Sequence, residues 1–118
     1  KYMYKELVAF QKMYDLVLVW HPILSKFPKN ARFTLGQEIE NELLYILKFI
    51  MKINTMPGDR NKFFYELSEE FDVLFVYTKL AYDLKFLSAK QLGFLSEKMN
   101  EVIKICSGWL KASNTKSI

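Results

Sequence analysis

The residue types that carry out catalysis are scarce in this chain and do not cluster. His21 is the only histidine, so no histidine-centred metal cluster fits within one chain, and we expect it to have a hydrogen-bonded structural role. Cys106 falls in an apolar helical stripe, where burial disfavours the reactive thiolate. Four glycines lie too far apart to form a phosphate-binding loop. These patterns predict no catalytic residue, no metal site and no cofactor.

Paired carboxylates are the remaining catalytic candidates. Glu38 and Glu42 lie one helical turn apart, and so do Glu66 and Glu70. General acid and base work requires carboxylates in a cleft that separates their pKa values, and nothing in the sequence marks such a cleft. The pairs are therefore interpreted as solvated acidic faces, and the protein as not an enzyme.

The elements that position these residues follow from hydrophobic spacing, which predicts an all-α, up-and-down antiparallel four-helix bundle. The chain of 118 residues is long enough to bury one core, so 1–118 is taken as a single domain. The clearest stripe begins at Leu92 and ends at Trp109, and Ser88 with Gln91 forms a capping box ahead of it. The predicted helices span about residues 4–26, 31–54, 59–86 and 88–112. Pro22 is expected to kink the first helix without ending it.

This topology brings together charges that are distant in sequence. The formal charge is +4, and the basic groups concentrate in the first and last segments. The turn between the first two helices and the turn between the last two lie at the same end of such a bundle. That end, called the basic end below, is predicted to hold Lys26, Lys29, Arg32, Lys85 and Lys90, with Asp83 as the only nearby acid. Lys98 and Lys104 extend the candidate surface along the last helix. The alternative is a set of unconnected lysines at helix ends.

Lysines greatly outnumber arginines, so contacts to a nucleic acid would be mostly point-charge attraction to phosphates. Sequence specificity would then come from RNA shape or from a partner protein.

The first two helices are apolar over more of their circumference than one core requires. The excess predicts a subunit interface. Its candidate residues are Phe10, Val17, Leu24, Phe33, Leu44 and Met51. The alternative is a wide core filled by the ten phenylalanines of the chain.

Three segments carry a family resemblance: KFPKNARFTLGQEIEN at residues 26–41, DLKFLSAKQ at 83–91 and SGWLK at 107–111. Over roughly residues 10–112 the chain resembles the accessory variability determinant (Avd-like) proteins of diversity-generating retroelements. It also resembles their sister group, the four-helix proteins encoded in intervening sequences of 23S ribosomal RNA genes. Ser107 stands where a second glycine is common in the accessory family.

The resemblance implies a ring-like homopentamer that associates with a retroelement reverse transcriptase and its template RNA, and with DNA as an open alternative. A scaffold homo-oligomer without a polymerase partner is the second hypothesis. A ligand-binding bundle is a weaker third, because no convergent polar groups mark a pocket. The single cysteine and the lack of a long apolar run predict a cytoplasmic protein without a membrane segment or signal peptide.

Overall fold

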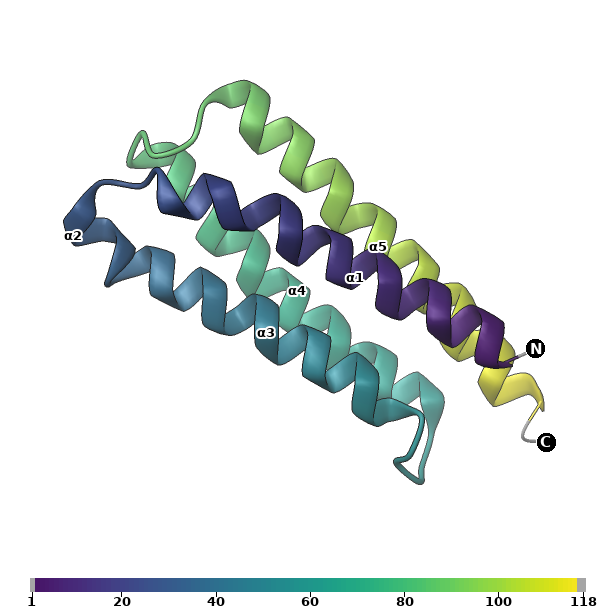
Figure 1. Ribbon diagram of the computed structural model, residues 1–118. Coiled ribbons are helices and arrows are strands. Elements are labelled where there is room, and N and C mark those ends of the chain that lie inside the picture. Colours follow the sequence, from purple (N-terminus) through teal and green to yellow (C-terminus); the bar gives the residue numbers. More distant parts are fainter. Residues whose placement is uncertain (1, 117–118) are drawn as a thin grey trace.

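Four long helices, α1 (Tyr2–Ser25), α3 (Leu35–Ile53), α4 (Arg60–Asp83) and α5 (Ala89–Lys116), form an up-and-down bundle (Figure 1). A short helix, α2 (Lys29–Arg32), lies in the connection between α1 and α3. The computed structural model describes the backbone of residues 2–116 and the side chains of residues 4–112. The long helices pack in the cyclic order α1, α3, α4, α5, so α1 lies diagonally from α4. The predicted fold class is confirmed.

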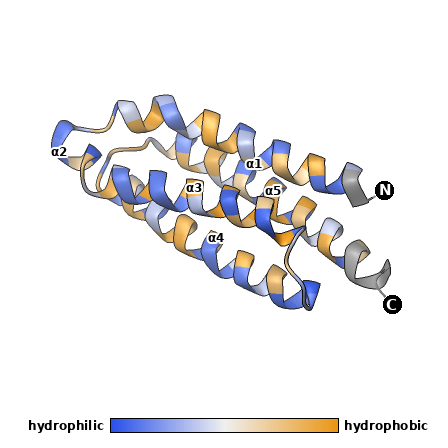
Figure 2. Ribbon diagram, turned by 60° about the horizontal axis from the view of Figure 1, so that its bottom comes forward, coloured by the Kyte–Doolittle hydropathy of each residue, from blue (hydrophilic) through white to orange (hydrophobic). Residues whose placement is uncertain are grey.

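The predicted stripes form the core. Met13, Leu16 and Trp20 of α1 are buried, and so is the α5 seam from Leu95 to Trp109. Hydrophobic residues recur along each long helix at the spacing that turns one side of the helix to the bundle axis (Figure 2). On α4 Phe63 is buried, and Phe64 packs partly exposed at the edge of the core.

Local hydrogen bonds explain where the helices begin and end. The predicted capping box is present: Ser88 N donates to Gln91 Oε1 over 2.8 Å, and Gln91 N donates to Ser88 Oγ over 3.0 Å. Asp59 caps α4 by accepting from Asn61 N over 2.9 Å. Pro22 lies inside α1, which continues to Ser25 as predicted.

The predicted second helix is divided in two. After α2 the backbone leaves helical geometry at Thr34, with φ −116° and ψ −97°, and α3 begins at Leu35. A Cβ on Gly36 would lie 3.2 Å from Ala31 O and 3.5 Å from the Phe27 ring, so this bend packs tightly. The turn between α4 and α5 is also longer than predicted, because Lys85 takes a left-handed conformation with φ 70° before α5 starts.

Candidate nucleic-acid interface

The two turns of the basic end lie together, as the topology predicts. The connection that contains α2 and the turn between α4 and α5 are at the same end of the bundle, opposite the two chain ends (Figure 1). The rings of Phe27 and Phe86 join them, with centroids 5.3 Å apart and an interplanar angle of 44°. Phe27 is buried, so this contact fixes one turn against the other.

All five cations of the basic end are exposed, and none takes part in an ion pair within the part of the chain whose side chains are described. Asp83, the acid expected to weaken the patch, is already paired with Lys79, whose Nζ lies 2.9 Å from Asp83 Oδ2. Segments 26–34 and 79–91 together contain six cations and one carboxylate. The net field at this end is therefore positive and open to solvent.

Lys98 and Lys104 lie farther along α5, roughly 12 and 21 Å from Lys90 at 1.5 Å per residue. Lys98 is engaged within its own helix: its Nζ lies 3.8 Å from Glu101 Oε1 and 5.6 Å from the centre of the Phe94 ring. Lys104 is exposed and lies beside a pocket between α1 and α5. The structure thus separates these two lysines from the five at the basic end.

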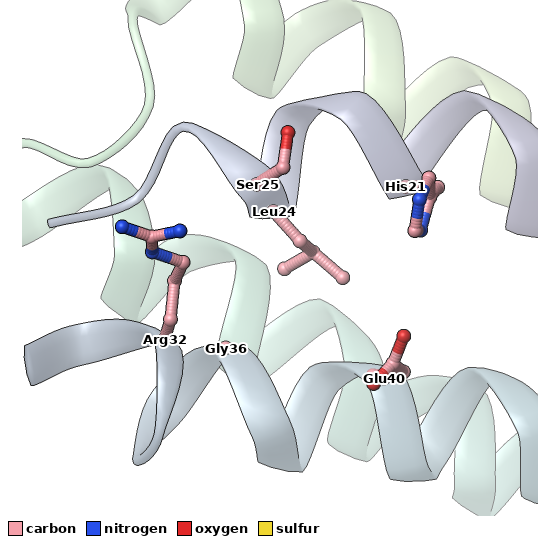
Figure 3. Close-up of a pocket in the computed structure, with 6 residues that line it drawn as sticks. All are labelled: His21, Leu24, Ser25, Arg32, Gly36 and Glu40. Carbon is pink, nitrogen blue, oxygen red and sulfur yellow. The ribbon is translucent and has the colours of Figure 1, made fainter. Parts of the chain in front are cut away.

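A pocket of about 150 Å³ opens between α1 and α3 next to the basic end, lined by His21, Leu24, Ser25, Arg32, Gly36 and Glu40. His21 and Glu40 project toward one another from the two helices, with Leu24 reaching into the space beside them (Figure 3). Arg32 extends toward α1 at the other side of the pocket, whereas the Ser25 hydroxyl points away (Figure 3) and donates to Pro22 O over 2.8 Å.

His21 is exposed and makes no hydrogen bond to any described residue, so the expected hydrogen-bonded structural role is not observed. Glu40, which the sequence did not single out, is half-buried and also lacks an ion-pair partner among the described residues. His21 and Glu40 lie at similar distances in sequence from the turn between α1 and α3. Because an antiparallel turn brings such positions side by side, this spacing could have predicted the pair from the sequence.

The acidic pairs Glu38/Glu42 and Glu66/Glu70 were interpreted from the sequence as solvated faces. The structure corrects this interpretation, because Glu42 on α3 lies next to Glu70 on α4. Burial, and then the neighbouring carboxyls of Glu70 and Glu38, raise the pKa of Glu42 to about 8. Its Oε2 atom is buried and has no donor among the described residues. Two ionised carboxylates repel one another and can only accept hydrogen bonds, so this contact between helices favours a proton on Glu42.

Cys106 is fully buried, and burial raises the pKa of its thiol to about 12. The thiol is therefore protonated and unreactive near neutral pH, as predicted. Within the described residues, no three side chains of the metal-binding types come together.

The six candidate interface residues have different environments. Phe33, Leu44 and Met51 expose 74%, 48% and 57% of their surface, so a second subunit has access to them. Phe10 and Val17 are partly buried against the core. Leu24 is only 8% exposed, which makes it a core residue with little surface left for a partner. Phe33 lies in the same turn as Arg32 and is equally accessible to a nucleic acid.

The resemblance of the sequence is tested by comparison with known proteins. The family model described as bAvd-like matches residues 7–113, nearly the whole chain. Neither a curated protein nor a solved structure matches. Among the described residues, no helix combines the length and the hydropathy needed to span a bilayer. The match extends through all four long helices and both turns of the basic end, and the chain belongs to the bAvd-like family.

Proposed function

We propose that this protein is a non-enzymatic, cytoplasmic accessory protein that binds nucleic acid and associates with a retroelement reverse transcriptase and its template RNA. Membership of the bAvd-like family suggests an accessory role in diversity-generating retroelements, and this family is generally without catalytic activity. The accessory protein would hold the RNA while the polymerase copies it in mutagenic cDNA synthesis.

The observation that carries the nucleic-acid proposal is the basic end. Its five unpaired cations come from two separate turns, which the contact between Phe27 and Phe86 holds together. Most protein contacts to nucleic acids go to the phosphate backbone, and Lys and Arg supply many of them. A fixed, solvent-facing group of cations meets that requirement without a deep cleft.

The second part of the proposal is self-association, with a homopentamer as the specific form. The exposed residues Leu7, Leu18, Leu44 and Met51 support an interface, because they lie on the neighbouring helices α1 and α3, and apolar side chains gathered on one side of a protein mark interaction surfaces. Replacing Leu44 and Met51 together with Glu should produce a monomer, as measured by native mass spectrometry. An unchanged subunit mass would exclude this surface as the interface.

The binding test is titration of labelled structured RNA and duplex DNA with protein at about 50 and 200 mM salt, the range in which several phosphate contacts weaken affinity strongly. The variant Lys26→Glu, Lys29→Glu, Arg32→Glu should lose binding while keeping its helicity and subunit mass. The matched control reverses three exposed lysines elsewhere, Lys48, Lys52 and Lys62. Equal loss in both variants would indicate net charge alone, and retained binding in the first would contradict the proposed surface.

The polymerase partner needs a separate test. Co-expression with the reverse transcriptase encoded beside this gene should yield a co-purifying complex, and omission of the accessory protein should reduce cDNA synthesis on the template RNA. If the protein self-associates but binds neither the polymerase nor nucleic acid, the scaffold hypothesis replaces this proposal.

A further inference from the structure

We propose that the pocket lined by His21, Leu24, Arg32, Gly36 and Glu40 holds one unpaired guanine base of the bound nucleic acid, with the Glu40 carboxylate reading the edge of the base. This inference rests on the proposed nucleic-acid function and adds base selectivity to a surface that otherwise attracts phosphates. It concerns the groove between α1 and α3, directly beside the basic end.

The backbone positions the pocket groups on facing sides of two helices. His21 and Leu24 lie three residues apart on α1, and Gly36 and Glu40 lie four residues apart on α3, so each pair shares one helix face. Gly36 packs closely against Ala31 and Phe27 and lines the pocket together with Arg32 and Glu40. His21 and Glu40 face each other across that space (Figure 3).

The carboxylate decides which part of a nucleotide enters. A phosphate-binding pocket has no carboxylate in its lining. Glu40 lines this pocket, and its carboxylate would repel phosphate at close range. An ionised carboxylate offers two acceptor oxygens and no donor. The Watson–Crick edge of guanine presents two adjacent donors, N1–H and the N2 amino group, whereas adenine, uracil and cytosine each present one donor group there. Guanine therefore matches Glu40 best among the bases.

The other pocket groups fit the same ligand. His21 offers an aromatic face with no internal hydrogen bond to break, and unpaired bases commonly stack on such rings. Leu24 lines the pocket only with the small apolar surface that it leaves exposed, and the Arg32 guanidinium is placed to meet the phosphate attached to the base. The volume of about 150 Å³ is below the roughly 300 Å³ typical of drug-sized pockets, so it suits one ring system.

The test compares two fluorescent single-stranded RNAs of about 12 nucleotides, a length within the usual site size of single-strand binding surfaces. One is oligouridine and the other carries a single central guanosine. We expect the wild-type protein to bind the guanosine RNA about tenfold more tightly, since a bidentate contact to a base edge discriminates strongly between bases. An inosine in place of guanosine, which lacks the N2 amino group, should lose most of that preference.

Glu40→Gln should abolish the guanosine preference while its affinity for oligouridine stays the same or rises. The matched control is Glu97→Gln, which removes the same charge from an exposed position on α5 and should keep the preference. Equal wild-type affinity for both RNAs, or an undiminished preference in Glu40→Gln, would overturn the subsite while leaving the nucleic-acid function intact. Failure to bind either RNA at about 50 mM salt would also overturn the subsite, and failure to bind structured RNA and duplex DNA as well would overturn the nucleic-acid function.

Discussion

The contact between Glu42 and Glu70 leads to a specific prediction about stability and pH. Replacing Glu42 with Gln should remove a pH dependence that the wild-type bundle shows between mildly acidic and alkaline conditions. Burial, together with the neighbouring Glu70 and Glu38, raises the Glu42 pKa from 4.5 to about 8, so the folded protein holds a proton that the unfolded chain releases. The contribution of this contact to the free energy of unfolding is fully present below about pH 4.5, and it is lost as the pH rises through about 8.

The size of the effect follows from the same shift. One pKa unit corresponds to about 1.4 kcal/mol, so a fully transmitted shift would change the free energy of unfolding by roughly 5 kcal/mol. Glu42 is only partly buried, and solvent screens a partly exposed contact. We therefore expect about 1–2 kcal/mol to be lost by the wild type across this pH range, and little of that loss in the glutamine variant, whose amide can donate to Glu70.

The assay is urea unfolding followed by helical circular dichroism at about pH 5, 7 and 9, which bracket the titration. The informative quantity is the difference in unfolding free energy between wild type and Glu42→Gln at each pH, because other titrating groups cancel in it. Glu69→Gln, an exposed neighbour on α4, is the control and should give a difference that does not change with pH. A constant difference for Glu42→Gln as well would refute the shared-proton argument.

Four further substitutions test other parts of the structure. Ser88→Ala removes one half of the α5 capping box and should cost about 1 kcal/mol of unfolding free energy in urea titrations. Gly36→Ala should destabilise by about 1 kcal/mol, because its Cβ would crowd Ala31 O, whereas Gly108→Ala, with nothing within 4 Å, should stabilise by about 0.5–1 kcal/mol; the reverse order would refute the crowding argument. Phe33→Ala should leave stability within about 0.5 kcal/mol, since the side chain is 74% exposed. A fall in its RNA affinity would assign Phe33 to base stacking, and a changed subunit mass would assign it to the interface.

Features that depend on local spacing could be predicted from the sequence. The seam of α5 and the box formed by Ser88 and Gln91 are encoded within a few residues, and both are present. The bend at Thr34 could not be predicted in the same way, because it depends on packing between Gly36, Ala31 and Phe27. A left-handed lysine in the turn before α5 likewise has no sequence signal, since Lys rarely adopts positive φ.

The candidate site likewise combines features that the sequence could predict with features that it could not. Placing the five cations at one end required only the order and direction of the helices. Pairing Glu42 with Glu70 or His21 with Glu40 required the register between neighbouring helices, which side-chain packing sets. The ion pair between Lys98 and Glu101 could have been predicted from the sequence, because the two residues lie three positions apart on one helix.

The basic end and the carboxyl contact should respond to pH independently of one another. Glu42 lies seven residues into α3, roughly 10 Å along the helix from its start near the basic end. That separation is about one Debye length at physiological ionic strength, so the charge gained when Glu42 loses its proton is largely screened from the phosphate-binding lysines. Raising the pH from about 6 to about 8.5 should therefore lower the unfolding free energy while changing oligouridine affinity less than about twofold at about 150 mM salt. A parallel loss of affinity in wild type, absent in Glu42→Gln, would show instead that the α3–α4 contact positions the binding surface.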